Sequence, residues 1–261
     1  MRRLLEAILI LLLPLSVTAQ EKLFDVRETL FDLEADHLGN LYLLHADQLI
    51  KTDQEGNEIA RFSRPDLGMP EIINVYDPMR VLLHYPEFNQ VVVLDNRLNL
   101  RFPPVDLFSL GFVDVPCVAL ADENFLWLYD QVKDQLVKLD MRRMQIVFRT
   151  PPLTQLLERE TEPMLMRSNV RGVFFLMKEG LARFDAMGNW MGFIPASDID
   201  DLHIVDDAWT FSRKGQITRA NGYTAQGMSV NSTMEFIHWT TDGQRVYLSD
   251  GKSIAVTPLL R

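Results

Sequence analysis

A short strand-like pattern recurs six times along the chain at an interval of about 40 residues. Each copy alternates apolar and polar residues, and most copies end in Asp or Asn. The copies begin at Leu49, Val91, Leu136, Leu181, Ile217 and Ile254, so successive intervals are 42, 45, 45, 36 and 37 residues. Six copies at this period are typical of a β-propeller, in which each repeat forms one four-stranded blade.

The residues around each copy agree with four strands per repeat. A second run, rich in aromatic and branched residues, lies just upstream of each copy, as in Val81–Tyr85 and Phe125–Tyr129. Turn residues separate the two runs, and a further turn follows the terminal Asp of a copy. In the turns that open at Asp53 and Asp185, we expect the Asp carboxylate to bond the turn backbone and a Gly to supply the positive φ. The sequence therefore predicts an all-β chain of six antiparallel blades, with helical character only over residues 153–159.

The two ends of the chain predict how the ring closes. The last repeat has only three strands, over residues 235–239, 245–249 and 253–257, whereas the segment 22–27 resembles a strand that belongs to no repeat. We expect this N-terminal segment to become the fourth strand of the last blade, because a closed ring leaves no exposed sheet edge. An open array of six repeats is the alternative, and it gives the N-terminal strand no role.

The first residues have the composition of a secretory signal peptide. A basic pair precedes an apolar run over residues 4–15, and Ala19 ends the segment with a small side chain. The alternative is a membrane anchor, which needs about 20 apolar residues. We predict a signal peptide over residues 1–19, cleaved after Ala19, and a single propeller domain over residues 20–261.

Charge and cysteine content narrow the classes of partner. Without residues 1–19 the formal net charge is −11, which disfavours nucleic acid and anionic lipid as ligands. Cys117 is the only cysteine and lies in an apolar run, so we expect a buried hydrophobic side chain rather than a nucleophile. We expect a monomer with no cofactor and no transmembrane segment in the mature chain.

Two repeats resemble those of the NHL and YVTN propeller families. The first reads Gly39-Asn40-Leu41-Tyr42, then Ile50 to Asp53, then Gly56-Asn57, and the second reads Asn124 to Trp127, then Val137 to Asp140. The likeness covers nearly all of the mature chain at the level of the fold, although Asn221 and Pro258 replace the Asp in later blades. It implies a six-bladed propeller from a superfamily that includes metal-dependent lactonases and hydrolases, carbohydrate lyases and non-catalytic adaptors, so the fold does not decide the function.

The segments that link one blade to the next suggest a protein-docking face. Three of them, over residues 62–70, 103–113 and 151–163, are long and apolar, and all such links lie on one face of a propeller. The alternative is that they fold inward to cap the channel or fill gaps between blades. The residues expected to contact a partner are Leu67, Met69, Leu107, Phe108, Phe112, Leu153 and Leu156.

Acidic and histidine residues offer an alternative metal site. Calcium needs several oxygen ligands in one place, and an acidic run precedes the inner strand of blade five. A solvated turn and hydrogen-bonded channel histidines are the competing interpretation. The candidate ligands of this alternative, a calcium-dependent lactonase-like hydrolase, are Asp198, Asp200, Asp201, His203 and His238.

The sequence thus favours an exported, non-catalytic propeller that binds a protein partner of the cell envelope, in the periplasm or at the cell surface. A position beside an outer-membrane secretion or assembly complex is compatible with this interpretation. Carbohydrate binding through tryptophan side chains is a third option.

Overall fold

The computed structural model describes residues 20–259 except 47, 123, 206–207, 223–225 and 231, and only the backbone of residues 72 and 73. The predicted signal peptide over residues 1–19 lies outside the described residues. No helix in the described part of the chain is long and apolar enough to cross a membrane.

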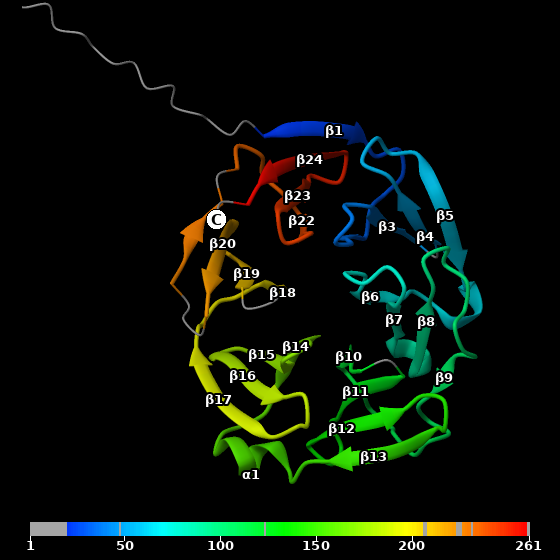
Figure 1. Cartoon of the computed structure of the whole chain (residues 1–261), viewed down its shortest axis with the longest axis vertical. Helices are drawn as coiled ribbons and strands as arrows, with labels where there is room; N and C mark the ends of the chain where they lie inside the picture. Colours follow the sequence, from blue (N-terminus) through cyan, green and yellow to red (C-terminus); the bar gives the residue numbers. More distant parts are fainter. Residues whose placement is uncertain are drawn as a thin grey trace, which may run out of the picture.

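Six four-stranded antiparallel sheets form a closed ring, which confirms the predicted six-bladed β-propeller (Figure 1). Blade 1 contains β2 (Asp32–Ala35), β3 (Leu41–His45), β4 (Gln48–Thr52) and β5 (Glu58–Ser63), and blade 2 contains β6 (Glu71–Asn74), β7 (Val81–Tyr85), β8 (Gln90–Leu94) and β9 (Val105–Asp106). Blade 3 contains β10 (Val118–Leu120), β11 (Phe125–Asp130), β12 (Gln135–Asp140) and β13 (Gln145–Arg149), and blade 4 contains β14 (Pro163–Asn169), β15 (Gly172–Met177), β16 (Gly180–Asp185) and β17 (Trp190–Pro195). Blade 5 contains β18 (Asp201–Val205), β19 (Ala208–Arg213), β20 (Gln216–Asn221) and β21 (Met228–Ser229), and blade 6 contains β22 (His238–Thr241), β23 (Arg245–Ser249), β24 (Ser253–Pro258) and β1 (Glu21–Asp25).

Short helices occupy three connections. The 3-10 helix η2 (Pro86–Phe88) lies within blade 2, and η1 (Pro65–Leu67) lies in the link from blade 1 to blade 2. The helix α1 (Leu153–Leu157) lies in the link from blade 3 to blade 4, within the segment predicted to be helical. The predicted link over residues 103–113 is shorter than expected, because β9 supplies the outermost strand of blade 2.

The core consists of apolar layers between neighbouring blades. Successive side chains of a strand point to opposite faces of its sheet, so a strand buried on both faces is apolar at almost every position. In β11, Leu126 and Leu128 pack in the layer against blade 2, whereas Trp127 and Tyr129 pack in the layer against blade 4. The aromatic-rich second strands of the repeats are therefore the most buried strands of their blades.

An Asp–Asn clasp closes the turn after several strands, as expected from the sequence. The Asp53 carboxylate accepts hydrogen bonds from the Asn57 backbone N–H at 2.8 Å and from its side-chain amide at 2.9 Å. Asp185 makes the same two bonds with Asn189, each at 2.8 Å. The Gly before each Asn has a φ of 84° or 90°, a region that residues with a Cβ rarely adopt. Equivalent clasps join Asp36 to Asn40 and Asp95 to Asn99.

The N-terminal strand closes the ring, as predicted. β1 pairs antiparallel with β24, which joins the first described strand to the last one (Figure 1). Phe24 also lies over Gly56 of blade 1, where any Cβ would come within 2.8 Å of the Phe24 ring. β1 therefore contributes both to the last sheet and to the layer between blades 6 and 1.

Removal of the closing strand should destabilise the whole ring. A variant of residues 20–261 without residues 20–26 loses the fourth strand of blade 6, so we expect its midpoint of thermal unfolding (Tm) to fall by about 10 °C or more. Circular dichroism measures the change, and a synthetic peptide of residues 20–27 added in trans should restore part of it. A Tm equal to that of the chain over residues 20–261 would contradict a closing role for β1.

Candidate functional site

The residues expected to form the docking face divide into buried and exposed groups. Leu67, Leu107, Phe112 and Leu153 are buried, and Leu156 is half-buried against the same core. At these positions the links fold inward and fill the spaces between blades, so the expectation of exposed contact residues is corrected there. Met69 and Phe108 remain exposed.

Hydrogen bonds show why the link from blade 2 to blade 3 folds inward. The Leu107 backbone N–H donates to the Asn89 carbonyl at 3.0 Å, and the Asn89 side-chain amide donates to the Phe112 carbonyl at 2.7 Å. Asn89 is buried and has a positive φ, so it fixes the link against the blade while Leu107 and Phe112 enter the core.

Five exposed apolar side chains nevertheless gather on the face that carries the links. This apolar patch comprises Met69, Phe88, Phe108, Val113 and Val132, with exposed fractions between 39 and 67 %. The link residues Phe108 and Val113 lie beside the turns between second and third strands: Leu107 bonds Asn89 next to Phe88, and the Gln131 N–H donates to Asp114 at 3.1 Å. The sequence analysis missed Phe88 and Val132 because it used the turns between second and third strands only to separate the strands. These turns lie on the same face as the links.

Acidic side chains border the apolar patch. Glu87 and Asp114 adjoin Phe88 and Val113 in sequence, and the Asp106 carboxylate accepts a hydrogen bond from the Phe108 N–H at 3.0 Å. None of the three carboxylates has an ion-pair partner within 4.0 Å among the described residues. The patch is therefore apolar at its centre and negatively charged at its edge.

A second group of polar side chains lies inside the channel. We call Asp32, Glu34, Arg167, Asp201 and His203 the channel cluster. They come from the inner strands β2, β14 and β18, which the topology places around the centre of the ring. The Arg167 guanidinium lies 3.7 Å from Glu34 and 3.5 Å from Asp201. The His203 ring lies 3.6 Å from Glu34 and 3.4 Å from Asp201.

The charges of the channel cluster are balanced by paired groups. Buried charges are stable only when they are paired, and here two carboxylates face one guanidinium and one imidazole. Thr240 also donates to Glu34 at 2.7 Å. Burial alone would lower the pKa of His203, but the carboxylates of Glu34 and Asp201 outweigh it and raise the pKa. Burial would raise the pKa of Asp201, but the charge of His203 and its hydrogen bond hold that pKa below its ordinary value.

Asp32 is the third carboxylate of the cluster, and among the described residues it has no ion-pair partner within 4.0 Å. Burial, and after it the negative charge of Glu34, raise its pKa from 3.8 to about 7. Its side chain accepts a hydrogen bond from the Leu33 N–H at 2.8 Å. Asp32 is therefore held close to its midpoint of titration at neutral pH.

The proposed calcium ligands do not converge. Asp201 and His203 belong to the channel cluster, whereas Asp198 pairs with Lys214 at 3.6 Å and Asp200 accepts the Lys214 N–H at 2.9 Å in a surface turn. His238 bonds the Leu30 carbonyl at 3.2 Å. Within the described part of the chain, no group of three or more His, Cys, Asp or Glu side chains could hold a metal ion.

Other side chains considered from the sequence are buried. Cys117 is buried, and burial raises the pKa of its thiol to about 12, which removes the thiolate needed for nucleophilic attack. Trp127, Trp209 and Trp239 are buried between blades and present no open ring face for a sugar. Trp190 is half-buried against Phe184.

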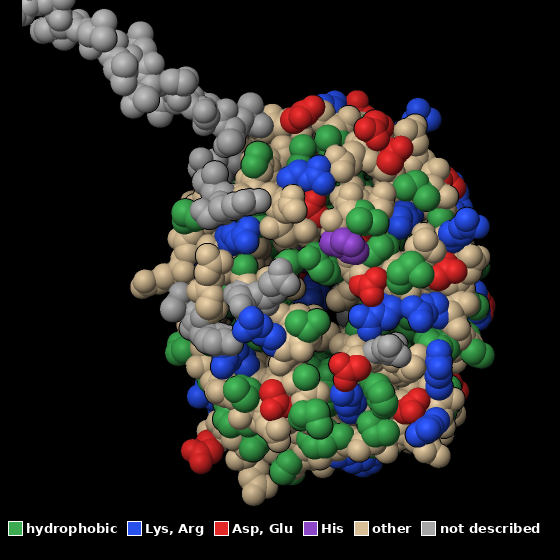
Figure 2. Space-filling view, viewed as in Figure 1, with side chains coloured by type: hydrophobic (Ala, Val, Ile, Leu, Met, Phe, Trp, Pro, Cys, Tyr) green, Lys and Arg blue, Asp and Glu red, His purple; other side chains and the backbone are tan. Residues whose placement is uncertain are grey.

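A cavity of about 670 Å³ lies on the other face of the ring, where first strands turn into second strands. It opens at the mouth of the channel, and Figure 2 shows a hollow at the centre of the ring with basic side chains near its rim. A smaller cavity lined by Glu34, Arg167 and His203 continues it toward the channel cluster. We call the larger cavity the funnel.

The comparisons with known proteins support the fold. No protein-family model matches the chain, and no curated protein matches it. The WD40 repeats of RRP9 superpose with a TM-score of 0.62 at 8 % identity, over 92 % of this chain and 97 % of that chain. A streptogramin B lyase superposes with a TM-score of 0.55 at 12 % identity, over 93 % and 87 % of the two chains. Virginiamycin B lyase from Staphylococcus aureus gives 0.55 at 14 % identity, over 87 % and 80 %.

These identities show the fold alone, because propellers with unrelated functions share it. The protein is a six-bladed β-propeller. Two surface features distinguish it: an apolar patch on the face of the blade links and a polar funnel on the opposite face.

The channel cluster should make stability depend on pH. Asp32 and His203 bind protons more tightly in the folded state than in the unfolded state, because both pKa values are raised on folding. Stability is therefore fully present below the unfolded pKa values and declines as the pH rises through the folded values. We expect the Tm to fall between about pH 4 and pH 8, from the ordinary Asp pKa of 3.8 to just above the folded Asp32 pKa of about 7.

Asp32→Asn tests this assignment because the amide stays neutral at every pH. The Tm of the variant should be close to that of the wild type near pH 4 and should exceed it by a margin that grows to a few degrees by pH 8, as measured by circular dichroism. Glu55→Gln, at an exposed carboxylate outside the channel, is the matched control and should follow the wild type. Parallel wild-type and Asp32→Asn profiles would show that Asp32 does not titrate in this range.

Proposed function

We propose that this chain is an exported, non-catalytic propeller that docks a protein partner of the cell envelope through the apolar patch. The observation that carries the proposal is the grouping of five exposed apolar side chains on one face of blades 2 and 3. Contiguous exposed apolar surface bordered by polar groups is typical of protein–protein contact sites.

The unpaired carboxylates at the edge specify the chemistry of the partner. Glu87, Asp106 and Asp114 would be best compensated by Lys or Arg side chains around an apolar segment. We therefore infer an amphipathic, basic segment as the partner, with its apolar residues on Phe108 and its charges toward the edge. Phe108 is the expected anchor, since aromatic side chains supply the largest apolar contact area.

The cellular placement rests on the N-terminal leader. A basic pair, an apolar run and a small-residue end are the features of a cleaved export signal. The acidic mature chain suits a partner with basic segments better than an anionic lipid surface. A place beside an outer-membrane secretion or assembly complex is compatible with both features.

Cleavage of the leader gives a direct test of export. The mature protein isolated from its source should begin at Gln20 and should be recovered outside the cytoplasm. Intact-mass spectrometry measures the N-terminus, and fractionation gives the compartment. A full-length chain that begins at Met1 and stays in the cytoplasm would refute the export proposal.

Site-specific photo-crosslinking tests the docking face. A photoreactive phenylalanine analogue at position 108 should give one adduct in the native envelope, and the crosslinked peptide of the partner should contain apolar and basic residues. The same analogue at Met187, which is also exposed and lies in a turn on the opposite face, is the matched control and should give no such adduct.

Charge substitution supplies the second arm of this test. Phe108→Asp and Met69→Asp should reduce the yield of an adduct formed from position 132 at least five-fold and leave the Tm within about 2 °C of the wild type, because both side chains are exposed. Adducts of equal yield from positions 108 and 187, or a yield unchanged by both substitutions, would exclude the apolar patch as the docking site.

A further inference from the structure

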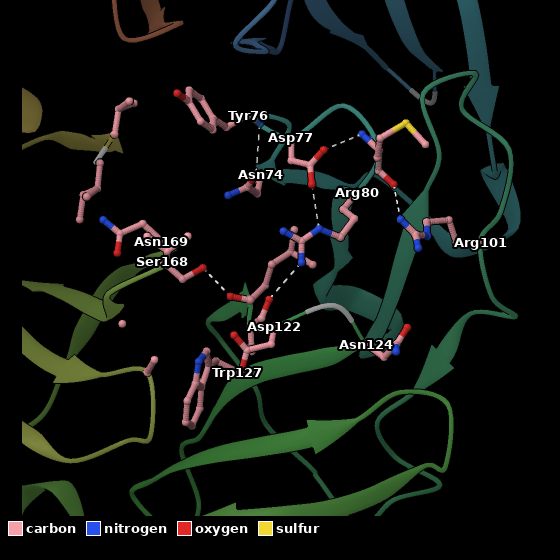
Figure 3. A pocket seen from close by; sticks show the side chains of 18 of the residues that line it. Asn74, Tyr76, Asp77, Arg80, Arg101, Asp122, Asn124, Trp127, Ser168 and Asn169 are labelled. Atoms are coloured by element: carbon pink, nitrogen blue, oxygen red, sulfur yellow. Dashed lines mark hydrogen bonds and ion pairs between the residues drawn. The ribbon is translucent and has the colours of Figure 1, made fainter. Parts of the chain in front are cut away.

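The funnel is a second surface feature, distinct in place and chemistry from the apolar patch. Its walls come from the turns after the first and third strands of blades 2, 3 and 4 and from the end of β18 in blade 5. Its volume of about 670 Å³ lies within the range of small-molecule sites, roughly 300 to 1,000 Å³. Figure 3 shows its polar side chains pointing toward one another from separate blades.

The carboxylates of the funnel already have cations. Asp77 accepts a hydrogen bond from the Arg80 guanidinium at 2.9 Å, and Arg80 also donates to the Ala121 carbonyl at 3.2 Å (Figure 3). Asp122 is paired with Lys138 at 2.9 Å. These two pairs are internally neutral, so they leave the charge of the remaining basic groups uncompensated.

Arg101 and Arg142 are those remaining groups. Each guanidinium lies 5.8 Å from the centre of the Phe102 ring, so the two cations share one aromatic side chain. One nitrogen of Arg101 donates to the Met79 carbonyl (Figure 3). Neither guanidinium has a carboxylate within ion-pair distance among the described residues, and the side chain of Arg142 has no hydrogen-bond acceptor there.

Two uncompensated guanidiniums are unexpected in a protein of net charge −10. Elsewhere in the described chain, several arginines form close carboxylate pairs, as Arg61 does with Glu58 and Arg64 with Asp66, each at 2.7 Å. A guanidinium offers five N–H donors in a plane and binds carboxylate or phosphate through two parallel hydrogen bonds. Arg101 and Arg142 therefore present donors that suit an oxyanion.

The end of β6, which also lines the funnel, adds a further donor. The Asn74 side-chain oxygen accepts a hydrogen bond from the Tyr76 N–H at 3.1 Å, which fixes the orientation of the amide. Its NH₂ group then points toward the open part of the cavity, as Figure 3 shows. A ligand with acceptor atoms at both ends would engage Asn74 on one side and the arginines on the other.

We propose that the funnel binds a small ligand that carries a carboxylate or phosphate group, with Arg101 and Arg142 as the principal donors and Asn74 as a second contact. The Phe102 ring lies near both guanidiniums and favours their positions through cation–π attraction. The site is open to water, so its affinity should fall as ionic strength rises.

Isothermal titration calorimetry of the full mature chain at constant ionic strength tests the proposal. The probes are citrate for a carboxylate ligand, pyrophosphate for a phosphate ligand and glucose as an uncharged control. Citrate or pyrophosphate should bind, glucose should not, and the tighter of the two anions identifies the type of oxyanion. Absence of binding by both anions at about 10 mM would overturn the proposal.

Variants localise the binding. The double variant Arg101→Gln/Arg142→Gln should bind the anion with at least ten-fold lower affinity. Arg142→Gln alone should lower the affinity about three-fold without loss of Tm, because this side chain is exposed and has no hydrogen-bond acceptor among the described residues. Arg143→Gln is the matched control, since Arg143 is adjacent and exposed but does not line the funnel. Undiminished anion binding by the double variant would place the anion elsewhere and refute the assignment.

The test of anion binding in the funnel is independent of the docking proposal. Phe108→Asp should leave anion binding unchanged, because the apolar patch and the funnel lie on opposite faces of the ring. A failure of the docking proposal therefore does not affect this one, and the calorimetric result does not decide the docking proposal.

Discussion

The pairing of β1 with β24 is the constraint on which the rest of the ring depends. A blade buries both of its faces only when a neighbour lies on each side, so an open array would expose an apolar layer at either end. The antiparallel pairing of Lys22 with Ala255 and of Phe24 with Ile254 joins the two ends of the chain within one sheet. The apolar layers, the position of the channel and the two faces all follow from this closure.

Most of the fold could be predicted from the sequence because its signals are local and repeated. The 36- to 45-residue interval, the aromatic-rich second strands and the Asp–Asn turns each depend on a few neighbouring residues. The burial of Leu107 and Phe112 could not be predicted in this way. An apolar link can fill a gap or face water, and the choice depends on Asn89, whose contacts with the link appear only after blade 2 has folded.

The funnel illustrates a second limit of sequence reasoning. Arg101 and Arg142 lie in corresponding regions of successive repeats, so the blade period itself brings them to the same face. Nothing in either turn indicates that they share the Phe102 ring or that nearby carboxylates are paired with other cations. The channel cluster could be predicted only in part. His203 was expected to line the channel, but the sequences around Glu34 and Arg167 gave no indication that these side chains lie there.

The ion pairs of Arg167 also determine what the central channel can be used for. Arg167 belongs to blade 4 and Glu34 to blade 1, which face each other across a six-membered ring, and the pair lies 3.7 Å apart. A polypeptide or glycan threaded along the axis would have to separate these side chains and break the ion pair that joins opposite blades. The ion pair therefore closes the channel to a threaded chain, and a ligand that binds at one face of the ring must be released from that same face.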